Sequence, residues 1–379
     1  MPIQRSLSLA PDVLAVLAEQ ELITLRWGEA EPKILSKLEL ARNLTWLQLQ
    51  DDKLWAAAHG SEGIHRFDLW ATAHDSKGFH HFYRYTMDDM ETPAQSWQLP
   101  KLYTGLQMDK NLVVFYDYSH TPLVVQVLDT DTGKLHPVQQ LENIEENTSD
   151  PKIAVERFID SYFSGRSQPL VHNGWFYVAE QRPYQTEDYY WLPQWVLRSW
   201  DLTVTDNIKE AETRQIPGFP LAFMANGELI TQEYAKYPFN LFNEEKQYRL
   251  NLLALGDNKA RLLQSRVISC LSSQFIFAND AVYVSCHPLV VDNNEPITQI
   301  LKLNPGQGFI EDENWTLSGY QILRGVSGDI ALFESVLDRS CNVSQLLAGQ
   351  EPKLISHFDG GCPSPHEEGI LHQMRKDGH

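Results

Sequence analysis

Short apolar runs recur along most of the chain, and polar turns separate each run from the next. The second run of each pair follows a turn such as Asn-Gly, Asn-Asp or Ser-Gly and ends in a polar residue. Examples of turn and second run are DDKLWAAAH (51–59), DKNLVVFYD (109–117), HNGWFYVAE (172–180), ANGELITQE (225–233), ANDAVYVSC (278–286) and VSGDIALFE (326–334). These turn pairs tolerate positive φ, so the pattern predicts a series of β-hairpins.

The hairpins repeat about every 50 residues, a period typical of four-stranded propeller blades. A third and a fourth run follow most hairpins, as in WVLRSWDLTV and ARLLQSRVIS. The chain therefore resembles the β-propeller superfamily at the level of fold. This resemblance implies an all-β, single seven-bladed propeller over residues 1–379. We expect blades at 12–40 plus 368–375, 43–87, 97–141, 168–216, 219–269, 270–317 and 319–359.

The first blade is predicted to take one strand from the other end of the chain. Residues 12–40 supply three strands, whereas 368–375 show an apolar alternation followed by Asp377 and Gly378. We expect residues 368–375 to pair with 12–19 and so close the ring, which would leave no free sheet edge. The alternative is a frayed C-terminal tail. No particular family is indicated, because Gly-His and Trp-Asp repeat marks are missing and the DTDTG turn at 129–133 occurs once.

Aromatic side chains concentrate in the connections after the second strand of the fourth and fifth blades. In a propeller, these connections and those between blades emerge on one face. The aromatic residues are Tyr184, Tyr189, Tyr190, Trp191 and Trp195 in RPYQTEDYYWLPQW (182–195), and Tyr234, Tyr237, Phe239 and Phe242 in the next insertion. An inserted loop at 142–167 contains DPKIAVERFIDSYF, which predicts a short helix on the same face.

Loops on a rigid scaffold commonly bind, and Tyr and Trp suit protein or carbohydrate recognition. The chain is therefore interpreted as a non-catalytic binding protein that grips a protein or a glycan through these aromatic residues. In the other interpretation, the loops only pack on each other and cap the blades.

Acidic residues recur where the predicted second strands end. They are Asp117, Glu180, Glu233 and Glu334. If they converge, they could hold a divalent cation, which makes a metal-dependent propeller hydrolase or lyase the alternative function. Otherwise such residues tie neighbouring blades together, and no cofactor is needed. We find no phosphate-binding loop, dinucleotide fingerprint or nucleophile elbow in the sequence.

The four cysteines leave the cellular compartment open. Cys270 and Cys286 flank one predicted hairpin, and Cys341 and Cys362 flank another, so both pairs could form disulfides. No export signal is visible, which favours the cytoplasm with free thiols. Paired cysteines and a removed leader would instead indicate the periplasm or the extracellular space.

Charge and hydropathy exclude two classes of partner. The net charge is −19, with 50 acidic and 31 basic residues. A non-specific nucleic-acid binder needs a basic face, so nucleic acid is not an expected partner. No apolar run approaches the length of a membrane-spanning helix, and a soluble protein is expected.

Overall fold

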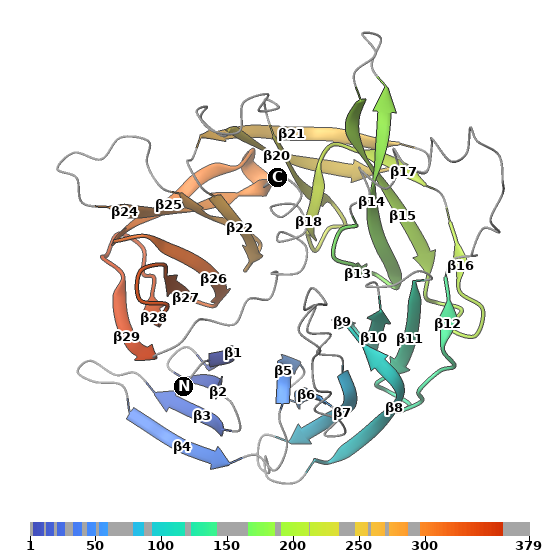
Figure 1. Cartoon of the computed structure of the whole chain (residues 1–379), viewed down its shortest axis with the longest axis horizontal. Coiled ribbons are helices and arrows are strands. Elements are labelled where there is room, and N and C mark those ends of the chain that lie inside the picture. The colour runs from blue at the N-terminus through green and yellow to red at the C-terminus, as the bar shows by residue number, and fades with distance from the viewer. Residues whose placement is uncertain are drawn as a thin grey trace, which may run out of the picture. The chain divides into compact units, whose positions relative to one another are not determined.

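The described strands of the computed structural model form seven antiparallel sheets, six of four strands and one of five. The structure describes residues 3–10, 13–18, 21–26, 33–39, 44–50, 53–59, 79–86, 93–117, 123–141, 166–185, 191–211, 213–234, 247–256, 259–269, 273–286 and 296–358. Within these ranges the chain is all-β, apart from one 3₁₀ turn, η1 (Pro305–Gln307). Each sheet is built from strands that follow one another along the chain (Figure 1).

The chain divides into two compact units. One contains Met1–Leu106, Phe115–His120 and Ile322–Ser364, and the other contains Gln107–Val114, Thr121–Gln321 and Pro365–His379.

Three sheets lie in the first unit, except that Gln321, the first residue of the last sheet, belongs to the second. The first sheet has β1 (Ile3–Ala10), β2 (Val13–Ala18), β3 (Glu21–Arg26) and β4 (Lys33–Glu39). The second has β5 (Leu44–Gln50), β6 (Lys53–His59), β7 (Phe79–Thr86) and β8 (Gln95–Tyr103). The last sheet of the chain has β26 (Gln321–Ser327), β27 (Ile330–Ser335), β28 (Cys341–Gln345) and β29 (Lys353–Phe358).

The third sheet contributes residues to both units. Its strands are β9 (Gly105–Asp109), β10 (Leu112–Asp117), β11 (Val124–Asp129) and β12 (Gln139–Gln140).

The remaining sheets lie within the second unit. The five-stranded sheet has β13 (Leu170–His172), β14 (Trp175–Gln185), β15 (Trp191–Asp201), β16 (Lys209–Glu210) and β17 (Arg214–Ile216). The next has β18 (Phe219–Phe223), β19 (Leu229–Tyr234), β20 (Gln247–Leu255) and β21 (Ala260–Ser269). The third sheet within this unit has β22 (Ser273–Ala278), β23 (Ala281–Cys286), β24 (Ile297–Asn304) and β25 (Ile310–Ser318).

The predicted hairpins are confirmed, and two of their turns have two successive residues with positive φ. Asn173 and Gly174 have φ of 51° and 77° between β13 and β14, and Asn279 and Asp280 have φ of 51° and 57° between β22 and β23. Two successive positive φ values give the twist that matches a two-residue hairpin.

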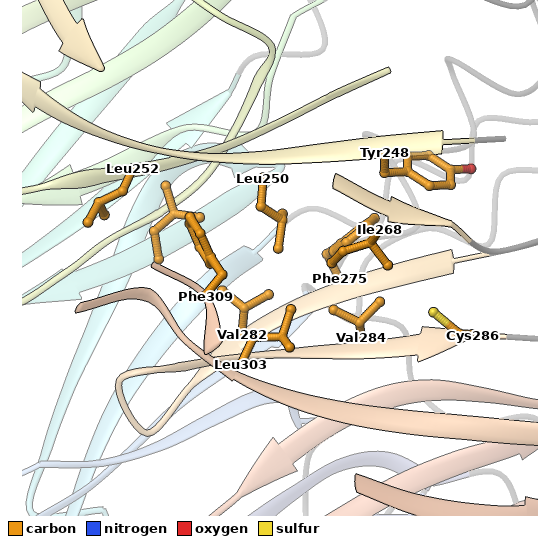
Figure 2. Close-up of a cluster of buried hydrophobic side chains, with 11 residues drawn as sticks. Tyr248, Leu250, Leu252, Ile268, Phe275, Val282, Val284, Cys286, Leu303 and Phe309 are labelled. Atoms are coloured by element: carbon orange, nitrogen blue, oxygen red, sulfur yellow. The ribbon is translucent and has the colours of Figure 1, made fainter. Parts of the chain in front are cut away.

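Buried side chains fill the space between neighbouring sheets of the second unit. Figure 2 shows Leu250 and Leu252 of β20 extending toward Val282 of β23 and Phe309. Leu250, Val282 and Phe309 are fully buried. Since burying one such side chain contributes about 1.5–3 kcal/mol, clusters of this kind fix how two consecutive sheets pack.

The predicted ring closure is wrong. Residues 13–18 pair with β1 on one side and β3 on the other, so no edge is left for 368–375. The first sheet is completed by Ile3–Ala10, a segment that was not predicted to be a strand. A neighbouring segment closes a much shorter loop than the distant terminus does, so it loses less chain entropy on pairing.

The boundary between the second and third sheets also differs from the predicted one. Strand β8 pairs with β7 and completes the second sheet, although most of it falls within 97–141, the range assigned to the third blade. The helix predicted in the 142–167 insertion and the tail at 368–375 lie outside the described residues. Among the described residues, no helix has the length and apolar character needed to cross a membrane.

Candidate binding site

The stretch 182–195, predicted to be a loop, is mostly a pair of strands. Register pairs Arg182 with Gln194, Tyr184 with Leu192, and Gln185 with Trp191. Only residues 186–190, which include the predicted binding residues Tyr189 and Tyr190, lie outside the described structure. Strands β14 and β15 therefore continue as one long hairpin into this stretch.

This hairpin extends beyond the ends of the other strands of its sheet. On one side, β13 pairs only with residues 175–177 of β14, and an isolated bridge joins Arg166 to Glu180. On the other side, β17 ends at Ile216, opposite Trp195. Residues 182–185 and 191–194 thus form a two-stranded projecting ribbon with no other described strand beside it, and Figure 1 shows it extending past the sheet.

Two prolines stand in this pair of strands, and the register accommodates both. Pro183 and Pro193 lie directly opposite each other. The N–H and C=O of Ala179 both bond to Ser167, on the side of β14 away from β15. The backbone N–H and C=O of every second residue beyond Ala179 in β14 therefore also point away from β15. Pro183 and Pro193 therefore form a non-hydrogen-bonded pair, in which the ladder needs no N–H from either residue.

The base of the projecting ribbon is packed into the protein. The partly buried Trp195 ring meets the Phe219 ring edge-on at a centroid distance of 5.4 Å. It also packs against the buried cluster that contains Leu197, Ile216 and Leu253. Trp195, predicted to bind a partner, is thus an anchor of the ribbon within the core.

The second aromatic insertion is described only at its start. Tyr234 ends β19, and its backbone pairs with Tyr248. Tyr237, Phe239 and Phe242 lie outside the described residues.

A chain of ion pairs crosses the sheet at the foot of the projecting ribbon. Glu180 Oε1 lies 3.3 Å from Arg166 and 3.0 Å from Arg198 Nη1. Arg198 also donates two hydrogen bonds to Glu210, at 2.8 and 2.7 Å, and its guanidinium lies 4.8 Å from the Trp200 ring centroid. The hydrogen bonds to Glu210 raise the pKa of Arg198 above its usual value, and Glu180 adds to this effect.

The other predicted metal ligands also face cations. Asp117 lies 3.3 Å from Lys101, and Glu334 lies 2.6 Å from Arg324. Glu233 lies 3.4 Å from Arg249 and accepts a hydrogen bond from Asn251 at 3.2 Å. Opposite charges this close neutralise a carboxylate, which makes it a weaker ligand for a cation.

The described part of the chain contains no group of three or more His, Cys, Asp or Glu residues placed to hold a metal. Each of the four recurring carboxylates forms an ion pair in the described structure. The recurring carboxylates were predicted from the sequence, but Arg198, Arg249 and Arg324 were not. Each arginine stands on a strand next to the one that carries its carboxylate, a relation that becomes visible only once the strands are paired.

Both cysteines in the described part of the chain are oxidised. Cys286 and Cys341 each form a disulfide, so the expectation of free thiols is wrong for these two residues. No described cysteine is free. Cys270 and Cys362 lie outside the described residues, so their assignment as the partners stays a prediction.

Comparison with known proteins identifies the fold. No protein-family model matches the chain, and no curated protein does. The periplasmic gluconolactonase PpgL of Pseudomonas aeruginosa is similar in structure, with a TM-score of 0.52, 15% identity, and coverage of 92% of this chain and 94% of that one. The chain has a β-propeller fold.

Two further solved structures are more distant. The β-propeller domain of the trilobed protease from Pyrococcus furiosus gives a TM-score of 0.49 at 9% identity, covering 94% of this chain and 96% of that one. Hsv2 of Kluyvelomyces marxianus gives 0.47 at 7% identity, covering 94% and 98%. At such identities similarity shows the fold alone, because one propeller scaffold supports many unrelated functions.

Proposed function

We propose that this propeller is a binding protein that recognises a protein or a glycan through the projecting ribbon of β14 and β15. The observation that carries the proposal is the extension of this hairpin beyond every other described strand of its sheet. An isolated two-stranded hairpin is at best marginally stable in water. A ribbon that projects without support from its own sheet is therefore best explained by contact with another molecule.

The composition of the ribbon supports this role. It carries Tyr184 and Trp191, and Tyr189 and Tyr190 belong to the same stretch. Tyr and Trp combine a large apolar surface with a polar group, and they dominate the energetics of many interfaces. We propose that Tyr234, Tyr237, Phe239 and Phe242 of the next insertion contribute to the same surface.

The foot of the ribbon is held firmly, which also favours binding. Trp195 packs on Phe219, and Arg198 joins Glu180 to Glu210 across three strands. A binding element fixed at its base loses less conformational freedom when a partner docks.

The test compares Trp191→Ala and Tyr190→Ala with the wild type. A partner is first captured and identified with the wild-type protein, or selected on a glycan array, and its affinity is then measured with each variant. Each substitution should weaken binding by more than about 1 kcal/mol, because each removes a large contact surface.

The matched control is Val204→Ala, which removes an exposed side chain just beyond the opposite end of β15. It should leave the affinity unchanged, and all three variants should retain the circular dichroism spectrum of the wild type. Unaltered affinity in both aromatic variants would contradict the proposal and leave the ribbon as a cap over the blades.

We also propose that the protein folds in an oxidising compartment, either the periplasm or the extracellular space. Disulfides at Cys286 and Cys341 support this placement, because such bonds form and persist where thiols are not continually reduced. The redox state of the cysteines in freshly lysed cells tests it.

A further inference from the structure

The projecting ribbon has two edges, and each carries a proline at an outward-facing position. Along β14, Ala179 directs its backbone N–H and C=O away from β15, so Gln181, Pro183 and Gln185 do the same. The proline is the middle of these three positions. It has no N–H to offer to an added strand.

The other edge has the same arrangement, established by an independent bond. The carbonyl of Ser199 in β15 accepts a hydrogen bond from Ala211, away from β14. Residues 197, 195, 193 and 191 therefore also face outward. Strand β17 covers this edge as far as Trp195, and Pro193 is the next outward position beyond its end.

The two prolines are therefore placed where a missing N–H affects only the edges. Inside the ribbon, the bonded pairs are Arg182 with Gln194 and Tyr184 with Leu192, and neither pair includes a proline. Proline at any of those four positions would remove a bond that holds the ribbon together. At 183 and 193 it removes a donor only from the surface that another chain would approach.

We propose that Pro183 and Pro193 close both edges of the projecting ribbon to strand addition. An exposed edge is a template for pairing, and the nearest available partner is the same ribbon of a second copy of this chain. The prolines prevent this self-pairing while leaving the ribbon intact. The inference does not depend on the proposed function, because it concerns the edges and not the side chains.

The two prolines also limit how any partner can use the ribbon. A molecule that adds a strand gains its affinity from main-chain hydrogen bonds. A strand added to either edge would lack the main-chain bond to the proline. The geometry therefore favours a partner that contacts the side chains of the ribbon over one that binds by β-augmentation.

The test restores both donors in the full chain with the double substitution Pro183→Thr, Pro193→Thr. Threonine favours strands and carries no large apolar surface, so any gain in association reflects the restored N–H groups. The oligomeric state is followed by light scattering and sedimentation over a concentration series. We expect the double variant to add an association step, with a molar mass twice that of the wild type at concentrations where the wild type shows no change.

The matched control is Gln194→Thr, which introduces the same side chain at an inward-bonded position of the same ribbon. It should associate as the wild type does. Hydrogen exchange should show new protection at residues 181–185 in the associated double variant.

Two outcomes would overturn the proposal. One is a double variant that is folded yet associates no more than the wild type. The other is equal association in Gln194→Thr, which would assign the effect to side chains. If the double variant fails to fold, the single substitution Pro193→Thr is measured in the same way, and unchanged association there also overturns the proposal.

Discussion

At the scale of single residues, several charged groups of the described structure form pairs that join adjacent strands. Arg198 is the best example, because its guanidinium contacts two carboxylates and an aromatic ring and is largely buried, with a side chain 14% exposed. The sequence showed the carboxylates at the strand ends but not their partners. Charge complementarity between strands becomes visible only when the register is known.

Replacing Arg198 tests how much these ion pairs and hydrogen bonds contribute to the free energy of unfolding. Arg198→Met keeps the aliphatic length but removes the ion pair with Glu180 and both hydrogen bonds to Glu210. We expect a loss of about 1.5–3 kcal/mol in the free energy of unfolding, measured by urea denaturation, since hydrogen bonds to charged groups have this strength.

The control for this substitution is Lys302→Met. Lys302 and Glu313 are 3.7 Å apart, and both side chains are more exposed than that of Arg198. This change should cost less than about 1 kcal/mol. Equal effects in the two variants would show that the Arg198 network adds nothing beyond an ordinary surface pair.

At the scale of elements, hairpin turns were predicted correctly because they depend on a few adjacent residues. Asn173, Gly174, Asn279 and Asp280 adopt the positive φ values that their residue types favour. The stretch 182–195 was predicted incorrectly. Two prolines in a short segment usually indicate a loop, and only the pairing register shows that both occupy positions without ladder bonds.

The connection between β17 and β18, which joins one sheet to the next, contains Gly218. Gly218 precedes β18 with φ of 78°, and a Cβ there would collide with the carbonyl oxygen of Gln232 in β19. Gly218→Ala should lower the free energy of unfolding by about 2–4 kcal/mol, because backbone strain and a steric clash act together.

Gly349→Ala is the matched control for the glycine prediction. Gly349 also has positive φ, 65°, but nothing lies within 4 Å of a Cβ there. This variant should lose only about 1 kcal/mol, the cost of a left-handed backbone. Chemical denaturation of both variants separates the clash from the strain, and a similar loss in the two would refute the predicted clash.

At the scale of the whole molecule, each sheet is made of consecutive strands, and covalent bonds supplement the noncovalent packing. The predicted exchange of a strand between the two ends does not occur in the first sheet, whose strands all come from residues 3–39. Cys286 and Cys341 are disulfide-bonded, so covalent cross-links add to the packing of the strands.

Reduction should therefore destabilise the protein. When thiols are blocked at cell lysis, mass spectrometry should find no alkylated cysteine, and reduction before blocking should yield four. A reductant should lower the Tm by about 5–10 °C, because each native disulfide contributes about 2–5 kcal/mol. Labelling of Cys286 or Cys341 without prior reduction would contradict both the bonds and the proposed compartment.

The sequence by itself determined the all-β class, the hairpin turns and the period of the strands. These features follow from local rules, because turn geometry depends on neighbouring residues and strand alternation on the twofold period of the backbone. Tertiary structure alone decided which segment completes the first sheet, which strands form the projecting ribbon and which cation faces each carboxylate. Each of these depends on register, and register is set by packing between segments that are distant in sequence.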